Sequence, residues 1–106
     1  MNLFGFLKRP DINQGAFQYQ NTESALLLDV RTEEEYTASH IPGSINLPLH
    51  KLPAAAEKIS YKNTPLLVYC LSGARSRQAV SYLTASGYTQ VTDIGAFSNY
   101  QGKAEK

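Results

Sequence analysis

The chain has 106 residues, with ten Lys and Arg against nine Asp and Glu residues, a net charge of +1, and one cysteine. A near-neutral chain without a run of like charges lacks the basic surface that nucleic-acid binding requires, and a lone cysteine cannot form an intrachain disulfide. The length predicts one domain over residues 1–106, with residues 1–10 as a short lead, in a reducing compartment such as the cytoplasm.

The N-terminal lead is apolar, but its basic residues come after the apolar stretch, the reverse of a secretory signal. It is also far shorter than the ~20 apolar residues of a membrane-spanning helix. We expect its apolar side chains to cover an edge of the core or to contact a partner or membrane surface. These side chains are Leu3, Phe4, Phe6 and Leu7.

Helical and strand patterns alternate along the rest of the chain. Thr32 and Glu35 form a capping box at the start of a short helix, and Gly87 ends a later one. Pro53 fits a helix only in its first turn. The predicted order is helix 12–20, strand 25–30, a helix from Thr32 to near His40, strand 44–47, helix 49–59, strand 66–69, helix 76–86, strand 90–94 and a helical turn at 96–100.

The predicted strands are apolar along their length, which is typical of a parallel sheet covered on both faces. The alternation therefore predicts a three-layer α/β domain. In such sheets, ligands bind beyond the carboxyl ends of the strands. Residues 29–31 and 70–75 both follow strands, so we expect them to share one rim of the sheet.

A small loop follows the cysteine, in the stretch CLSGARS. Gly73 can take a positive φ, so a tight loop of this kind can turn its backbone N–H groups inward and bind an anion. The helix that follows adds positive partial charge at its start, and Arg75 and Arg77 add full charges. These features favour the thiolate, which is the nucleophilic form. The loop predicts a reactive Cys70 rather than an inert buried cysteine.

Three segments, in order, resemble the rhodanese family. The cysteine loop fills the family pattern Cys-x-x-Gly-x-Arg-Ser, in register at Cys70, Gly73, Arg75 and Ser76. Residues 29–36 resemble its Asp-Val-Arg…Glu-Tyr segment, and residues 40–46 resemble its His-Ile-Pro-Gly-Ala-x-Asn segment. The resemblance implies a single-domain thiosulfate sulfurtransferase with an α/β/α fold and a mostly parallel central sheet of about five strands.

The same resemblance implies that Cys70 takes a sulfane sulfur from thiosulfate or a persulfide donor, becomes a persulfide and passes the sulfur to a thiophilic acceptor. No metal or organic cofactor is needed. Arg75 joins Cys70 as a catalytic candidate, either binding the donor's anionic end or bracing the loop. Substrate-binding candidates are the residues whose backbone amides would hold that anionic end: Leu71, Ser72, Gly73, Ala74 and Ser76. The expected acceptor is cyanide, a thiol such as glutathione, or a thioredoxin-like or sulfur-carrier protein.

Asp29 and Arg31 are predicted to support the site. A purely structural role stays open for both, in which Asp29 accepts bonds from loop amides and Arg31 pairs with Glu34 or Glu35. His40 is interpreted as a structural hydrogen-bonding residue before the Pro-Gly turn. Tyr69 is assigned to the core.

Two other functions stay open. Cysteine phosphatases resemble this layout but use Cys-x5-Arg, whereas this loop has Cys-x4-Arg and so forms a smaller anion cup. The domain could also act as a protein-to-protein sulfur relay or binding module. His40 and His50 lack the cysteine spacing of a metal site.

Overall fold

The structure, a computed structural model, describes residues 9–106, so the predicted role of the apolar lead at residues 3–7 lies outside the described residues. Helices and strands alternate in the predicted order. The elements are α1 (Ile12–Gln20), β1 (Leu26–Asp29), α2 (Glu33–Ala38), β2 (Ile45–Asn46), the 3-10 helix η2 (Leu49–Ala54), α3 (Ala55–Lys58), β3 (Leu66–Cys70), α4 (Ala74–Ala85), β4 (Val91–Ala96) and the 3-10 helix η3 (Phe97–Asn99).

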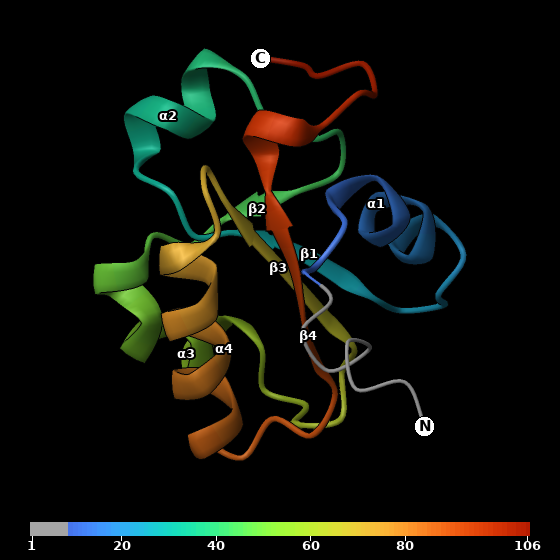
Figure 1. Ribbon diagram of the computed structural model, residues 1–106. Coiled ribbons are helices and arrows are strands. Elements are labelled where there is room, and N and C mark those ends of the chain that lie inside the picture. The colour runs from blue at the N-terminus through green and yellow to red at the C-terminus, as the bar shows by residue number, and fades with distance from the viewer. Residues whose placement is uncertain (1–8) are drawn as a thin grey trace.

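The described strands form one parallel sheet in the order β2-β1-β3-β4. Figure 1 shows α1 on one face of this sheet, α3 and α4 on the other, and α2 beyond the carboxyl ends of the strands. The α/β/α prediction is confirmed. The described part of the chain has four strands in this sheet rather than about five.

The two central strands, β1 and β3, are buried on both faces because their side chains alternate between two hydrophobic clusters. Leu28 and Val68 pack in the cluster beneath α3 and α4. Leu27 and Leu67 pack in the cluster beneath α1. This double burial explains why both strands are almost continuously apolar in sequence.

Side-chain caps build the starts of two helices, α1 and α2. The Asp11 carboxylate accepts hydrogen bonds from two backbone N–H groups in the first turn of α1. At the start of α2, the Thr32 hydroxyl accepts from the Glu35 N–H while the Glu35 carboxylate accepts from the Thr32 N–H, so both bonds of the capping box are present. These bonds pair N–H groups that would otherwise lack an intrahelical acceptor.

The predicted α-helix at residues 49–59 is wrong in type over its first half. The chain forms a 3-10 helix over Leu49–Ala54 and a single α-helical turn over Ala55–Lys58. Pro53 lies five residues into this segment, where it has no N–H for an α-helical hydrogen bond. The α-helical turn therefore begins only after the proline.

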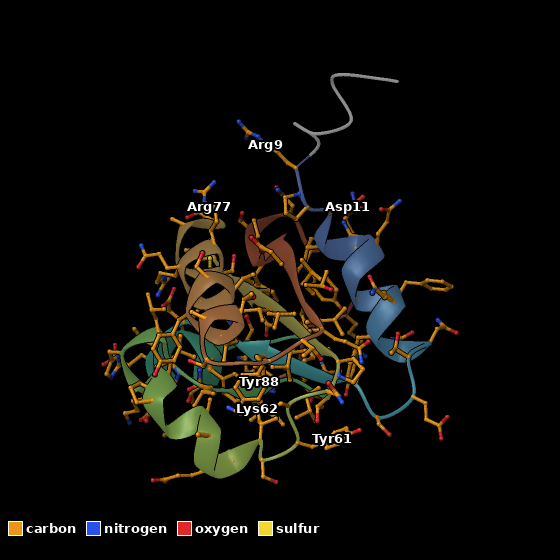
Figure 2. The ribbon with its side chains drawn as sticks, turned by 90° about the horizontal axis from the view of Figure 1, so that it is seen from below. Arg9, Asp11, Tyr61, Lys62, Arg77 and Tyr88 are labelled. Carbon is orange, nitrogen blue, oxygen red and sulfur yellow. The ribbon has the colours of Figure 1, made fainter. Side chains whose placement is uncertain are left out.

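Two contacts tie the outer layers to the sheet. α1 approaches β4 so closely that a Cβ atom added at Gly15 would lie 2.3 Å from the Ile94 Cβ, which explains a glycine within this helix. At the amino ends of the strands, the Tyr88 hydroxyl lies 3.2 and 2.6 Å from the carbonyls of Ala55 and Ile59. The Lys62 ammonium sits 4.0 Å from the centre of the Tyr88 ring (Figure 2).

Within residues 9–106, no helix is long and apolar enough to cross a membrane.

Candidate active site

The two predicted site segments do meet at one rim of the sheet. β1 and β3 are neighbouring parallel strands, with Asp29 in register with Tyr69. Residues 29–31 and the cysteine loop therefore leave the sheet side by side, at its carboxyl end. This is the edge at which parallel α/β sheets bind ligands.

The Cys70 sulfur lies under the start of α4. Its Sγ accepts a hydrogen bond from the Gly73 N–H, with 3.0 Å between nitrogen and sulfur. Gly73 is the N-cap residue of α4 and has φ +105°, a conformation that favours glycine. There is room for a side chain here, since a Cβ atom at this position would meet no atom within 4 Å. Glycine is therefore needed for its backbone conformation and not for space.

The start of α4 leaves N–H donors free near the sulfur. α4 begins at Ala74, two residues earlier than predicted, and no side chain caps it. The N–H groups of a first helical turn have no intrahelical acceptor and carry the positive end of the helix dipole. The first N–H groups of α4 thus lack a side-chain cap, directly after the Gly73 N–H that contacts Sγ.

Cys70 is buried, whereas the loop that follows it is partly exposed. Cys70 is fully buried and packs within the cluster beneath α3 and α4, while Leu71 is 42% exposed and Ser72 and Ala74 are exposed. The Leu71 carbonyl accepts a hydrogen bond from the Ser98 N–H at 3.1 Å. In this arrangement Cys70 is closed to solvent.

Arg75 lies in the first turn of α4 and points toward α2. Its Nη1 and Nη2 donate to the two carboxylate oxygens of Glu35 at 2.6 and 2.9 Å, a bidentate ion pair between residues 40 positions apart. Hydrogen bonding to Arg75 lowers the pKa of Glu35 to about 2, and the same pair raises the pKa of Arg75. The pair joins the cysteine loop to the capping box of α2.

Ser76 ties the loop to β4. Its buried hydroxyl lies 3.0 Å from both the Gly73 carbonyl and the Asp93 carboxylate. Asp93 also accepts the Gly95 N–H, at the point where the register between β3 and β4 shifts. The Ser76 side chain is thus fully engaged with the protein.

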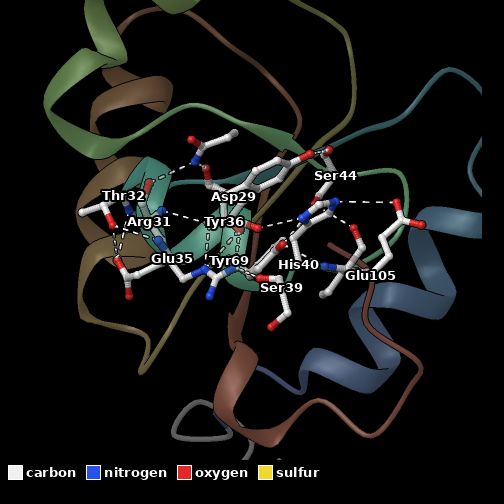
Figure 3. A network of polar contacts seen from close by, with 12 residues as sticks. Asp29, Arg31, Thr32, Glu35, Tyr36, Ser39, His40, Ser44, Tyr69 and Glu105 are labelled. Atoms are coloured by element: carbon white, nitrogen blue, oxygen red, sulfur yellow. Dashed lines mark hydrogen bonds and ion pairs between the residues drawn. The ribbon is translucent and has the colours of Figure 1, made fainter.

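Asp29 and Arg31 form a buried ion pair with each other, at 2.6 Å, so the predicted pairing of Arg31 with Glu34 or Glu35 is wrong. Burial alone would lower the pKa of Arg31, but the hydrogen bonds and charge of Asp29 raise it. The guanidinium also donates to the Ser39 carbonyl at 2.7 Å (Figure 3). It stacks over the Phe97 ring at 4.5 Å. Both side chains are engaged in contacts within the protein at this rim of the sheet.

Tyr69 and His40 complete this network. The Tyr69 ring is buried, as predicted, and its hydroxyl lies 3.0 Å from the Ser44 hydroxyl and accepts the Ile41 N–H at 3.1 Å. Burial raises the pKa of Tyr69 well above its usual value. His40 stacks on Tyr36 and contacts the Tyr36 carbonyl through Nδ1 at 2.8 Å, consistent with a structural role (Figure 3).

A pocket of about 330 Å³ opens beside the loop. Its walls come from the segments after β1 and β2 and from Arg75: Val30, Arg31, Thr32, Pro48, Leu49, His50 and Arg75. Among the described residues, no group of three or more His, Cys, Asp or Glu side chains is placed to hold a metal ion.

The rhodanese-like domain model matches residues 15–103, which is most of the chain. The chain belongs to the rhodanese-like domain family. Its cysteine loop, with Cys70 at the end of β3 and Gly73 at the start of α4, thus sits in a rhodanese-like fold, as the motif predicted.

Two curated relatives and one solved structure illustrate the likeness. The chain is 35% identical over 94 residues to the thiosulfate sulfurtransferase GlpE of Tolumonas auensis, covering 88% of this chain and 87% of that one. It is 32% identical over 99 residues to the putative sulfur carrier protein YrkF of Bacillus subtilis, covering 91% of this chain but only 53% of that one. A rhodanese with anions from E. coli has a TM-score of 0.72 and 34% identity, covering 77% of this chain and 98% of that chain. These relatives support sulfur transfer as the class of activity.

Two residues that hold the rhodanese loop were not found from the sequence. Glu35 was predicted as a capping residue, which it is, but nothing in the sequence indicates its bond to Arg75 across 40 positions. Asp93 showed only one weak signal, an acidic residue within the predicted strand 90–94.

Proposed function

We propose that this protein is a sulfurtransferase that carries a sulfane sulfur on Cys70, as a persulfide, from thiosulfate or a persulfide donor to a thiophilic acceptor. One observation carries the proposal: the Gly73 N–H points at Sγ from 3.0 Å, at the uncapped start of α4. N–H groups placed in this way stabilise a thiolate and, after transfer, the negative terminal sulfur of a persulfide.

In the proposed reaction, the Cys70 thiolate attacks the outer sulfur of thiosulfate. A sulfur–sulfur bond forms to Sγ, the bond within thiosulfate breaks, and its electron pair leaves with sulfite. The backbone amides of Leu71, Ser72, Gly73, Ala74 and Ser76 are proposed to hold the donor's anionic end. Arg75 braces the loop through Glu35, and the Asp29–Arg31 pair fixes the neighbouring segment. The exposed Leu71–Ser72 segment moves aside to admit the donor.

The acceptor is proposed to be cyanide, a small thiol, or a thioredoxin-like or sulfur-carrier protein. The chain has one cysteine and therefore no second thiol to resolve the persulfide. A free reactive thiol also persists best in a reducing compartment, so we propose a cytoplasmic location.

The test is intact-mass measurement after incubation with thiosulfate. The expected result is one added sulfur atom, removed by cyanide with release of thiocyanate, and absent in Cys70→Ser. A Cys70→Ser chain that still gains sulfur, or a folded wild-type chain that gains none from thiosulfate or from a small persulfide, would contradict the proposal.

A protein-to-protein relay is the second candidate, supported by the likeness to a putative sulfur carrier protein. It predicts that Cys70 exchanges sulfur with a protein persulfide much faster than with thiosulfate. A cysteine phosphatase is disfavoured because Arg75, the arginine of the Cys-x4-Arg loop, is bound through both terminal nitrogens to Glu35. Hydrolysis of a phosphate ester without sulfur uptake would reverse that choice.

A further inference from the structure

Two of the three arginines beside the cysteine loop are held in ion pairs. Arg75 gives both terminal nitrogens to Glu35, and Arg31 is bound to Asp29. Each pair is neutral as a unit. Apart from Arg77, which is exposed on α4 and forms no ion pair with another described residue, the positive groups beside the loop are the partial charges of backbone N–H groups, which together amount to roughly half an elementary charge at a helix N-terminus.

This arrangement suits a donor with one negative charge better than one with two. Thiosulfate is a dianion that must approach a thiolate, so it needs more compensating charge than a thiosulfonate or an organic persulfide, which carry one. We propose that Glu35 is a specificity-determining residue: by binding both terminal nitrogens of Arg75 and neutralising its charge, it favours singly charged organic sulfur donors over thiosulfate. This inference rests on the proposed sulfur transfer through Cys70.

The pocket beside the loop agrees with an organic donor. Arg75 forms part of its wall, and Val30, Pro48 and Leu49 supply apolar surface around it. Val30 belongs to the same buried cluster as Cys70, and Arg75 brings the start of α4 to the pocket, whose lining does not include Cys70 itself. An alkyl or aryl group can occupy this apolar space, whereas the sulfonate of thiosulfate has nothing apolar to place there.

The chemistry balances with such donors and needs no other reactant. The Cys70 thiolate attacks the outer sulfur of a thiosulfonate, the donor's sulfur–sulfur bond breaks, and the electron pair leaves with the sulfinate. With an organic persulfide, the same attack expels a thiolate. In both cases Cys70 ends as a persulfide.

Glu35→Gln tests the proposal, because it removes the charge that holds Arg75 and keeps the length of the side chain. Initial rates with cyanide as acceptor would be measured for thiosulfate and for methanethiosulfonate. We expect the ratio of kcat/KM for thiosulfate to that for methanethiosulfonate to rise about tenfold, through a lower KM for thiosulfate. Glu34→Gln is the matched control, since Glu34 is exposed on the same turn of α2 and its loss makes the same change in net charge. That control should leave the ratio within about twofold of wild type.

A double variant isolates Arg75 as the group released. Glu35→Gln combined with Arg75→Gln should return the ratio to about the wild-type value, because the freed cation is gone. Glu35→Asp, which keeps the charge but is too short to hold both nitrogens as well, should raise the ratio less than Glu35→Gln and serves if that variant fails to fold.

Equal loss of rate with both donors in Glu35→Gln would overturn the proposal and leave Glu35 as a brace of the loop. The proposal is equally overturned if Glu34→Gln changes the ratio as much as Glu35→Gln does. Failure of the proposed function is distinguishable, because wild-type Cys70 would then gain no sulfur from either donor by intact mass.

Discussion

The Glu35–Arg75 pair should make the stability of the fold depend on pH in a way that one substitution can reveal. Glu35→Gln replaces the carboxylate by a side chain of the same shape that is always neutral. Glutamine also satisfies the capping box at this position, so the start of α2 stays capped. The variant thus removes the ion pair and little else.

The size of the effect follows from the pKa of Glu35. Its lowering from 4.5 to about 2 corresponds to at most ~3.4 kcal/mol, at 1.36 kcal/mol for each tenfold step. The side chains of Arg75 and Glu35 are 34% and 27% exposed, so solvent screens the pair. Exposed ion pairs contribute much less than this limit, while a bidentate pair contributes more than a single contact. We therefore expect the free energy of unfolding to fall by about 1–1.5 kcal/mol at neutral pH in the variant.

The pH dependence has a definite direction. Because the pKa of Glu35 is lower in the folded chain than in the unfolded chain, the pair contributes fully above pH ~4.5 and is lost as pH falls toward ~2. Wild type should therefore exceed Glu35→Gln in stability at pH ~7, keep less than half of that advantage at pH ~3, and lose it near pH ~2.

Urea unfolding at several pH values, followed by circular dichroism, measures this difference. At neutral pH the variant's midpoint should be lower by about 1 M. Glu34→Gln serves again as the control and should follow the wild-type curve. An advantage of wild type that stays constant down to pH ~3 would refute the reasoning, because Glu35 would then act through packing and not through charge.

Three substitutions test the packing around the site, each by urea unfolding. Tyr69→Phe should cost about 1–3 kcal/mol, because it leaves a buried backbone N–H without its acceptor; a loss below ~0.5 kcal/mol would contradict this. Gly15→Ala should cost about 1–3 kcal/mol or more, because the new methyl group collides with Ile94; unchanged stability would show that α1 sits farther from the sheet. Ser76→Ala should cost about 1–2 kcal/mol and slow sulfur uptake at Cys70, while Ser81→Ala, on the exposed face of α4, should do neither.

Local sequence signals predicted the fold well where one interaction dominates. The capping box at Thr32 placed the start of α2, and the double burial of β1 and β3 was visible as two apolar runs. The prediction of residues 49–59 failed because hydrophobic periodicity does not separate an α-helix from a 3-10 helix. The signal for the 3-10 helix was Pro53, which lies beyond the first turn of the predicted α-helix.

The site divides in the same way between local and distant information. The motif at residues 70–76 predicted the tight loop and its glycine, because these depend on neighbours in sequence. It did not predict the direction of Arg75, since Glu35 lies 40 residues away. Arg31 was assigned to the wrong acid for a similar reason: several carboxylates lie within reach in sequence, and only the folded backbone selects Asp29.

Residues outside the cysteine loop hold it in position, while the residues of the loop itself surround the sulfur. The loop contains Cys70 and the backbone amides around it, but three other segments hold it: Glu35 on α2, Asp93 on β4 and Ser98 in η3. Each contact acts on a different part of the loop, namely its guanidinium, its buried hydroxyl and its first carbonyl. A hydrogen bond of 3.0 Å to sulfur is lost after a displacement of about an ångström, since the interaction weakens steeply with distance and angle. Moving residues 70–76 alone to another strand–loop–helix unit should therefore transfer the cysteine and not its reactivity, whereas moving the loop together with its three partners should transfer both, as the rate of thiosulfate-dependent sulfur uptake would report.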